Sequence, residues 1–475
     1  MFYERIQKFS QSELSLIHEA SMEILAKNGL VFADAETLDT FKSRGFAVEG
    51  KRVLFTERQI LTALETAPDR FKFQARNPQK SLWIGGEDYA LAPTYGPPFV
   101  VDAKGRQSAG TMADYEKAVK LAQTSEFVDF NAFKYLAPGD VPAETSYLDM
   151  VRAALVLSDK PLMGGTDGKT GSENTMKLMD LVFGKEFVDS NAVTMGLINP
   201  LSPLSYAHEM SGAIMAYARR RQPVIIHNMI MAGASGPIRL PGLMAIVNAE
   251  ILGGMTLAQL VGPGTPVIYG SNSCPIFMKT GGAEISNPQS LWVCSAVNQL
   301  ARYYRLPSRT GGAVTDAHIP DAQAMAESAM TLMVTVMAGT NLILHAFGQL
   351  GCFIGFSFEK WIMDEELCGY MRSLSRKFEI SRESLDVAAT IEVGSGGTFL
   401  TRPETAKLCR KAFYAHKLFN KHDEAGWRKE GALELVAKAQ KIIERRLGDY
   451  QAPDLPPALV KDLDALVEAL KASHH

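Results

Sequence analysis

The sequence predicts an α/β protein built on a (β/α)8 TIM barrel, with helical extensions before and after it. From about residue 110, short apolar stretches alternate with amphipathic stretches of helical spacing, the pattern of parallel strands joined by crossover helices. Seven such strands follow one another from residue 127 onward. A doubly wound open sheet is the alternative, but the phosphate-binding turns GxGxxG and GxxxxGKS/T that favour it do not occur in the sequence.

Residues 1–80 are expected to form a helical N-terminal extension. The stretch SQSELSLIHEASMEILAKNGL offers Ser10 or Ser12 as a helix cap, apolar residues at helical spacing, and Gly29 as a stop. A second short helix is expected within ERQILTALETAP.

Residues 81–379 are expected to form the barrel. The β-rich stretch SLWIGGEDYALAPTYGPPFVVDAKG, with its Gly and Pro turns, is expected to supply one strand, with FVV near residue 100 as the candidate. The seven further strands are expected in FVDFNAFKYL, KPLMGGT, NAVTMGLINP, PVIIHNMI, TPVIYGSNS, LPSRTGGAV and NLILHAFGQL. Helices are expected in TMADYEKAVKLAQTS, ETSYLDMVRAALVLS, GSENTMKLMDLVFG, SYAHEMSGAIMAYARRR, LPGLMAIVNAEILGGMTLAQLV, NPQSLWVCSAVNQLARYY, PDAQAMAESAMTLMVTVMAG and FSFEKWIMDEELCGYMRSL.

Residues 380–475 are expected to form a C-terminal extension that is mostly helical after GSGGTFLTRPETA. A Pro-rich connector, QAPDLPPALV, precedes a last amphipathic helix, KDLDALVEALKA. This helix is expected to pack on the body or on a sister subunit, so we expect a homo-oligomer.

Composition and charge exclude several classes of partner. Hydrophobic residues make up 46% of the 475 residues, and 49 Lys and Arg against 52 Asp and Glu leave a formal net charge of −3. No basic run suits nucleic acid. The N-terminus lacks the apolar core of a signal peptide, and no apolar run is judged long enough to span a bilayer. Five scattered cysteines fit a reducing compartment, so a cytoplasmic protein is expected.

Polar residues stand where the expected strands end. In a barrel, chemistry sits at the carboxyl ends of the strands, and the loops that follow here are rich in Gly and Pro. We therefore expect a lined pocket rather than a sealed core. The polar residues at these ends are Asn131, Thr166, Asn199, His227, Asn228, Asn272, Thr315, Asp316 and His345.

His345 is the first candidate, because it lies late in an otherwise apolar strand. By alternation it should share a face with Ile343 and Phe347. The alternative is a core histidine with a satisfied hydrogen bond. With Asn272 and Asp316 at neighbouring strand ends, a ligand-binding role is equally favoured.

A cation is one ligand that such a pocket could hold. Asp316 could neutralise it, or could simply cap backbone groups in its loop. The aromatic residues Tyr95, Phe99 and Phe356 cluster near the same face. Most aromatic residues there are better explained as core, but Tyr95 and Phe356 stand beside glycines and could present their rings to a quaternary ammonium.

Metal and covalent chemistry are poorly supported. The sequence has no CxxC, HxH or HExxH; Cys274 and His227 could meet across neighbouring strands, but two scattered candidates are weak evidence for zinc. Lys279 could form a Schiff base, although it lies past its strand in a loop. No bound metal is expected.

Several long segments resemble those of the trimethylamine methyltransferase (MttB) superfamily. They are LSLIHEASMEILAKNGL, GASGPIRLPGLMAIVNAEILGGMTLAQLVGPGTPVIYG, TDAHIPDAQA, FSFEKWIMDEELCGY and GSGGTFLTRPETAKLCR. The resemblance covers nearly the whole chain. The founding members carry pyrrolysine, which is missing here, so the chain is similar to the glycine betaine branch.

The resemblance implies transfer of a methyl group from a quaternary amine, glycine betaine first of all, to Co(I) of a cognate corrinoid protein, leaving dimethylglycine. The chain has no DxHxxG-type motif, so the cob(I)alamin or methylcobalamin cofactor is expected on that separate protein and none is expected to be bound permanently. Tyr95, Phe356 and Asp316 are then assigned to the cation, and His345, Asn272 and His227 to the carboxylate. Asp316 and His345 are the candidate catalytic residues.

Three alternatives remain open on the sequence. The methyl donor could be proline betaine, carnitine or butyrobetaine. The chain could instead be a Schiff-base or metal-dependent barrel lyase. It could also be a non-catalytic protein that binds betaine on the same fold.

Overall fold

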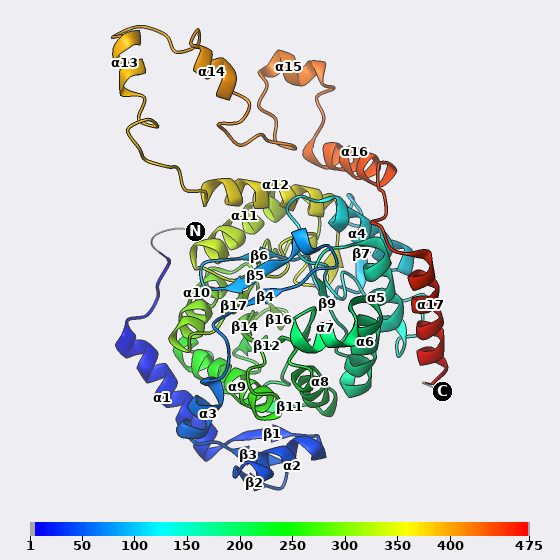
Figure 1. Cartoon of the computed structure of the whole chain (residues 1–475). Coiled ribbons are helices and arrows are strands. Elements are labelled where there is room, and N and C mark those ends of the chain that lie inside the picture. The colour runs from blue at the N-terminus through cyan, green and yellow to red at the C-terminus, as the bar shows by residue number, and fades with distance from the viewer. Residues whose placement is uncertain (1–4, 474–475) are drawn as a thin grey trace.

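A computed structural model of the chain describes residues 5–473, and its centre is a curled sheet of seven parallel strands (Figure 1). Each neighbouring pair in this sheet is parallel, and every residue of the seven strands is buried. Burial of both faces is typical of a parallel sheet covered by helices. The predicted α/β class with a parallel sheet is confirmed. In spatial order the strands are β6 (Ala90–Leu91), β18 (Leu342–Ile343), β17 (Ser308–Thr310), β14 (Val267–Ser271), β12 (Val224–Asn228), β10 (Thr194–Ile198) and β9 (Leu162–Met163).

The predicted helices that follow the strands are confirmed. They cover the outer face of the sheet (Figure 1), and α7 is an addition that the sequence pattern did not indicate. The helices are α4 (Met112–Thr124), α5 (Ser146–Leu157), α6 (Gly168–Phe183), α7 (Lys185–Ser190), α8 (His208–Arg219), α9 (Leu240–Val261), α10 (Pro288–Tyr303), α11 (Ala322–Met337) and α12 (Phe358–Leu374). Short strands in the loops are β13 (Met231–Ala232), β15 (Cys274–Phe277), β16 (Gly282–Ala283) and β19 (Gln349–Leu350).

The assignment of FVV to the central sheet is wrong. These residues form β7 (Phe99–Val101), which pairs with β8 (Gln107–Ala109) and β20 (Gly355–Phe356) in a separate sheet. The strand beside β18 is β6, which lies earlier than β7 in the same β-rich stretch. Pro93, Pro97 and Pro98 follow β6, and proline supplies no backbone N–H to a strand ladder, so the chain leaves the sheet there.

The expected strand in FVDFNAFKYL is wrong: the structure has only an isolated bridge there, between Asn131 and Leu162. Residues 129–131 lie between the two edge strands: Asp129 N–H donates to the Leu91 carbonyl at 2.9 Å, and Met163 N–H donates to the Asn131 carbonyl at 3.0 Å. The carboxylate of Asp129 also accepts from Leu91 N–H at 2.8 Å. This segment therefore touches both β6 and β9.

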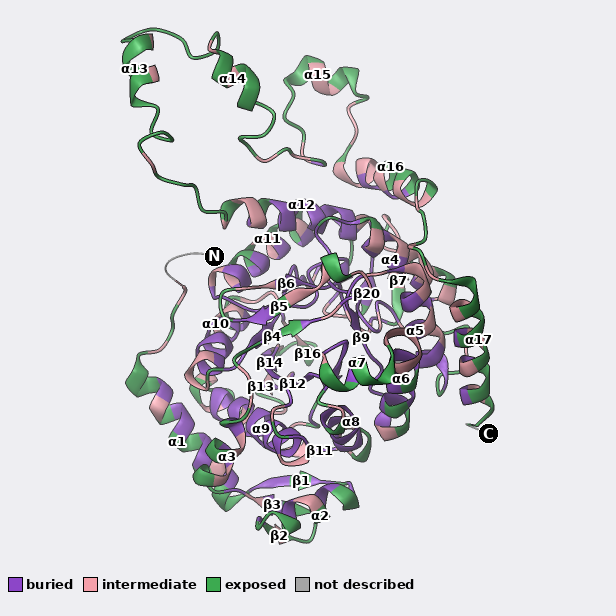
Figure 2. Cartoon of the chain, in the orientation of Figure 1, coloured by how far each residue is buried: buried purple, intermediate pink, exposed green. Residues whose placement is uncertain are grey.

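Helix α9 is the most apolar helix of the chain. By length and composition it could cross a membrane, contrary to our expectation, but 83% of its most apolar window is buried inside the protein, as Figure 2 shows. Its buried Glu250 accepts from Ser202, from Leu204 N–H and from Asn228, at 2.7–2.9 Å. A buried carboxylate with three donors belongs to a core helix.

The N-terminal region packs beneath α9 (Figure 1). The predicted cap Ser10 is confirmed: Ser10 and Glu13 form a capping box at the start of α1. Gly29 follows α1 with φ +68°, and a Cβ there would lie 2.2 Å from the Val53 carbonyl oxygen. The elements are α1 (Gln11–Lys27), β1 (Leu30–Phe32), α2 (Ala35–Ser43), β2 (Ala47–Glu49), β3 (Arg52–Leu54) and α3 (Glu57–Leu64), with β11 (Ser205–Tyr206) beside β1; a hairpin of β4 (Arg70–Phe73) and β5 (Leu82–Gly85) follows, with a 3-10 turn at Pro78–Lys80 between its strands.

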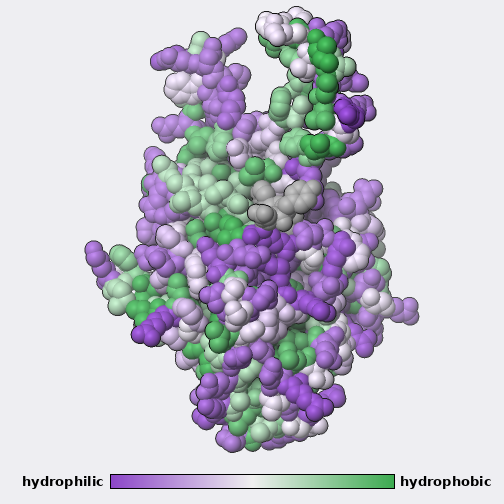
Figure 3. Space-filling view, turned by 90° about the vertical axis from the view of Figure 1, so that its left-hand side faces the viewer, coloured by the Kyte–Doolittle hydropathy of each residue, from purple (hydrophilic) through white to green (hydrophobic). Residues whose placement is uncertain are grey.

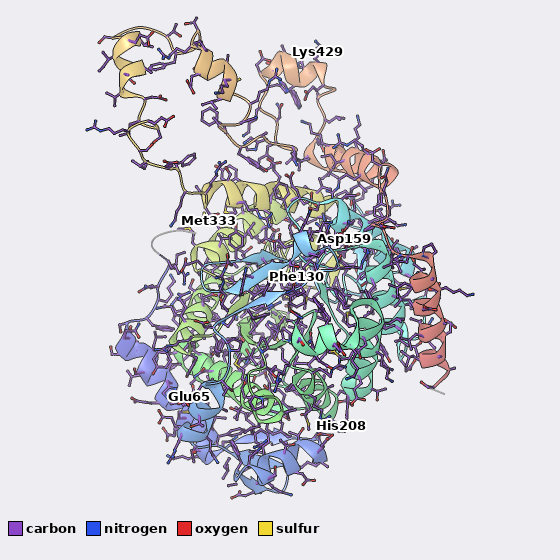
Figure 4. The ribbon with its side chains drawn as sticks, viewed as in Figure 1. Glu65, Phe130, Asp159, His208, Met333 and Lys429 are labelled. Carbon is purple, nitrogen blue, oxygen red and sulfur yellow. The ribbon has the colours of Figure 1, made fainter. Side chains whose placement is uncertain are left out.

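The C-terminal region begins as an arm that projects from the body (Figure 1). The arm carries α13 (Val387–Val393), α14 (Pro403–Leu408) and α15 (Glu424–Lys429), and none of these helices has a buried residue. Figure 4 contrasts Lys429, out on the arm, with Phe130 inside the body. The chain then returns through α16 (Leu435–Gly448), which packs on α12, and α17 (Pro457–Ala472), which packs on α5 and α6.

We predict that Asp129→Ala lowers the thermal unfolding midpoint by several degrees. The substitution leaves the buried Leu91 N–H without its side-chain acceptor and removes the carboxylate that Arg372 contacts at 2.5 Å, a loss of about 2–3 kcal/mol. Calorimetry measures the midpoint. Asp39→Ala, which removes an exposed carboxylate of α2, is the control and should shift it little. Equal midpoints for both variants would contradict the prediction.

Candidate functional site

Three neighbouring strands carry residues at one level near their carboxyl ends. His227 of β12 pairs in register with Gly270 of β14, and Gly270 pairs with Arg309 of β17. The residues beside them face the outer helices: the Tyr269 hydroxyl donates to α9 at 2.9 Å, and Thr310 accepts from a thiol of α10 at 3.1 Å. Since side chains alternate along a strand, His227 and Arg309 point to the inner face of the curled sheet.

Gly270 lets these two side chains lie side by side. A Cβ at this position would lie 3.2 Å from the His227 Cβ and 3.4 Å from the Arg309 Cδ. On its other side, His227 Nδ1 lies 2.9 Å from Asn199 Oδ1. Because an amide oxygen only accepts, Nδ1 carries the imidazole proton, and the buried Nε2 has no hydrogen-bond partner. The row therefore runs across β12, β14 and β17 and reaches the residue that follows β10; its members are Asn199, His227, Gly270 and Arg309.

An apolar layer lies beneath this row. Leu197, Ile225 and Ile268 stand two residues before Asn199, His227 and Gly270, and all three belong to one buried cluster with the rest of the sheet interior. The residues between them, such as Ile226, belong to a second cluster packed under the outer helices. The polar row is therefore the first polar layer above a sealed interior.

His345 faces the same region, but not for the predicted reason. Strand β18 ends at Ile343, and His345 has φ +60°, so the expected alternation with Phe347 is wrong. Its Nδ1 accepts from the Tyr95 N–H at 3.3 Å and lies 3.2 Å from the Thr94 hydroxyl. Because Nδ1 accepts, the proton of the neutral imidazole is on Nε2, and backbone hydrogen bonds on both sides fix the turn that carries the ring.

The candidate site carries a positive charge, and this charge comes from Arg309. Burial lowers the pKa of His227 and of His345 well below the usual histidine value, and the positive charge of Arg309 lowers both further. Burial also lowers the pKa of Arg309, to about 9, which still leaves it charged at neutral pH. The region therefore holds one permanent cation beside two neutral imidazoles.

Arg309 is the site residue that sequence reasoning missed. The pattern of LPSRTGGAV predicts a buried strand but does not single out its charged residue. A charged residue flanked by Ser308 and Thr310 inside a buried strand is the signal that could have found it, because arginine is seldom fully buried without a function or a partner.

The aromatic candidates are scattered. Tyr95 is half-buried, its ring lies 6.2 Å from that of Phe133, and its hydroxyl interacts with Thr166. Phe99 is partly exposed on β7. The ring of Phe356 is fully buried, with edge contacts to neighbouring aromatic rings at 4.8 and 5.9 Å. Tyr95 therefore lies beside His345, whereas Phe356 packs against other aromatic rings in the core.

Asn272 and Asp316 lie to one side of the row. Asn272 lines a small cavity of about 30 Å³ together with Phe353, whose ring is 4.4 Å from that of His345. The carboxylate of Asp316 accepts from Ile285 N–H at 3.2 Å and from Ser286 N–H at 3.1 Å. These bonds are those of a loop-capping carboxylate; its cation-binding role stays a prediction.

Metal and Schiff-base candidates are not assembled into a site. Within residues 5–473, no three His, Cys, Asp or Glu side chains are placed to hold a metal ion. Cys274 is buried, which raises the pKa of its thiol to about 12. Lys279 is exposed in the turn between β15 and β16.

A curled parallel sheet with a buried, basic and polar layer at its strand ends defines a barrel-like α/β protein built to bind a small molecule. The sequence comparisons add the family. The family model described as trimethylamine methyltransferase (MTTB) matches residues 2–474. The chain belongs to this family and is a methyltransferase.

Two relatives align over nearly the whole chain. The glycine betaine methyltransferase of Desulfitobacterium hafniense is 37% identical, with 98% of this chain and 96% of the relative covered. The proline betaine:corrinoid methyltransferase of Eubacterium limosum is 33% identical, with 96% and 95% covered. Among solved structures, the monomethylamine methyltransferase of Methanosarcina barkeri superposes with a TM-score of 0.53 at 10% identity, covering 96% of this chain and 90% of that one; it supports the fold alone.

We predict that His227 and His345 stay neutral from pH 8 down to pH 6, because the pKa of each lies well below the usual value. NMR of protein labelled at histidine Cε1 measures this, with each signal assigned by its loss in His227→Gln or His345→Gln. A histidine-containing peptide in the same tube serves as reference. Titration of either assigned signal together with the peptide would contradict the prediction.

Proposed function

We propose that the protein transfers a methyl group from a quaternary amine, glycine betaine first of all, to Co(I) of a cognate corrinoid protein, and leaves dimethylglycine. The observation that carries this proposal is the basic row at the strand ends of a chain that belongs to a methyltransferase family. Two relatives named for betaine substrates support it. Proline betaine, carnitine and butyrobetaine are the alternative donors.

The proposed reaction does not require a nucleophile from the protein. The corrinoid partner supplies Co(I) as the methyl acceptor. In the donor, the bond between the methyl carbon and nitrogen breaks, and its electron pair stays on nitrogen as the lone pair of a neutral tertiary amine. The chain therefore has to bind the donor, aim one methyl group at the mouth of the site, and exclude water.

Roles for single residues follow from this chemistry. We assign His227, His345 and Asn272 to the carboxylate end, because the first two are buried beside a cation and the third lines the adjoining cavity. We assign Tyr95 to the ammonium end, where an aromatic face contributes roughly 0.5–2 kcal/mol. Phe99, Phe356 and Asp316 remain proposed members of that end. Asp316 and His345 remain the proposed catalytic residues, through positioning rather than proton transfer.

The scaffold is proposed to be a closed (β/α)8 barrel. Residues 129–131, bonded to Leu91 on one side and to Met163 on the other, would be its eighth strand. We propose that the chain divides into an N-terminal extension of residues 1–80, a barrel of residues 81–379 and a C-terminal extension of residues 380–475. We also propose a cytoplasmic location, which suits a reduced cobalt centre and the five free cysteines.

The function is tested by mixing the protein with free cob(I)alamin and a panel of methylated amines. We expect the absorbance change to methylcob(III)alamin with glycine betaine. His345→Ala should raise the Kd for glycine betaine about 10–100-fold, because a hydrogen bond to a charged group is lost; calorimetry measures it. The control is His208→Ala, on the exposed start of α8.

Two results would count against this proposal. Betaine binding without methylation of cobalt, even with corrinoid proteins added, would make the chain a binding protein. Betaine affinity unchanged by His345→Ala would remove that residue from the site. Borohydride trapping at Lys279 would favour a lyase instead.

We further propose a homo-oligomer whose arm packs on a second copy. The arm exposes large apolar side chains over its surface (Figure 3), including Leu400 at 83% and Phe413 at 81%. Exposed apolar patches of this kind mark contact surfaces. The apolar side chains of the arm are Phe378, Ile380, Leu385, Val387, Ile391, Phe399, Leu400, Leu408 and Phe413.

Replacing Leu400 and Phe413 together by Ser should shift the protein to a smaller assembly, since each loses apolar area that would be buried. Sedimentation velocity measures the mass. Lys407→Ser on α14 is the control and should leave the mass unchanged. A monomeric parent protein would contradict the proposal.

A further inference from the structure

Arg309 stands apart from the other buried cations of the chain. It is 0% exposed, and Nε and both terminal nitrogens of its guanidinium lack a hydrogen-bond partner among the described residues. Buried Lys160, by contrast, donates to two carbonyls at 2.6 Å each, and buried Lys360 pairs with Asp364. A buried charge without a partner is costly, so the guanidinium calls for an anion that the described residues do not supply.

No side chain nearby supplies that anion. Among the described residues, no carboxylate is one of the groups that shift the pKa of Arg309. Its inner neighbours His227 and His345 are neutral. The positive charge of Arg309 is therefore complemented by an anion from outside the chain. That anion must enter deeply enough to reach a fully buried guanidinium.

The shape of the group favours a carboxylate. A guanidinium presents a planar fork of donors that matches two carboxylate oxygens. Arg309 reaches into the site across Gly270, beside His227, with the apolar residues Ile225 and Ile268 beneath. An anion bound there would be shielded from water, where a charge-assisted hydrogen bond is strongest.

We propose that Arg309 anchors the carboxylate of the methyl donor, so that the substrates of this protein are zwitterions that carry a carboxylate close to the quaternary nitrogen. This inference rests on the proposed function and narrows it: methylated amines without a carboxylate, such as choline and trimethylamine, are poor ligands. With the carboxylate held by Arg309, the ammonium group lies at the other end of the ligand, the end to which Tyr95 is assigned.

The test compares ligands and variants by calorimetry. Glycine betaine should bind the parent protein, and choline, in which a hydroxymethyl group replaces the carboxylate, should bind at least about 100-fold more weakly. Arg309→Met should raise the Kd for glycine betaine about 100-fold and leave that for choline unchanged. Arg309→Lys should lie between, since lysine keeps the charge but not the fork.

The matched control is Arg302→Met. Arg302, at the end of α10, also has a buried terminal nitrogen without a partner, but another nitrogen of its guanidinium donates to the Ala338 carbonyl at 2.8 Å, away from the site. This variant should bind glycine betaine as the parent protein does. Arg309→Met and Arg302→Met of equal affinity would overturn the inference.

Thermal unfolding separates an anchor from a structural arginine. Without ligand, Arg309→Met should unfold at the parent temperature or roughly 2–6 °C above it, because an unpaired buried charge is removed. Glycine betaine should raise the midpoint of the parent protein but not that of Arg309→Met. A midpoint that falls in the variant without ligand would overturn the inference, because the guanidinium would then be stabilising the fold.

Failure of the inference and failure of the proposed function give different results. If Arg309→Met still methylates cobalt from glycine betaine with the parent KM, the anchor is wrong and the function stands. If glycine betaine binds through Arg309 but no amine of the panel methylates cobalt, the anchor stands and the function is wrong.

Discussion

The parallel register of β12, β14 and β17 is the constraint on which the site depends. It places His227, Gly270 and Arg309 at one level, although each comes from a different crossover unit about 40 residues from the next. Strands of a parallel sheet end on the same side, so their last inward residues meet without any contact in sequence. Glycine at the centre of the row then decides which side chains touch. A larger residue there would separate the arginine from the histidine.

The helices and the parallel sheet could be predicted because the spacing of apolar residues along the sequence indicates which residues are buried. Alternating apolar and amphipathic stretches predicted the helices α4 to α12, apart from α7, and the parallel sheet. The predictions are wrong where the structure of a segment depends on its length or on the elements packed around it. FVV has the composition of a strand, but the prolines before it move it to another sheet. Helix α9 has the composition of a membrane span, yet the layers around it keep it buried.

The candidate site is only partly predictable from the sequence, and the reason is geometric. His227 and His345 can be predicted as candidates because they are polar residues near strand ends. Arg309 was missed because a strand of three residues gives too little alternation to tell its inner from its outer face. The conformation of His345, with φ +60°, cannot be read from strand periodicity, since the strand has already ended. Whether Asp316 faces a ligand or only its own loop depends on hydrogen bonds that composition does not encode.

A lone buried arginine also suits the electrostatics of the proposed reaction. A bound betaine carries no net charge, because its own ammonium partly offsets the pull of Arg309 on its carboxylate. As the methyl group departs, the nitrogen becomes neutral and the remaining molecule gains a net negative charge. The attraction between Arg309 and the carboxylate therefore grows along the reaction, and most of all where water is excluded. An interaction that is stronger in the transition state than in the ground state lowers the barrier. The neutral state of the neighbouring histidines also favours the reaction, because a second positive charge would repel the ammonium of the substrate before the methyl group has left.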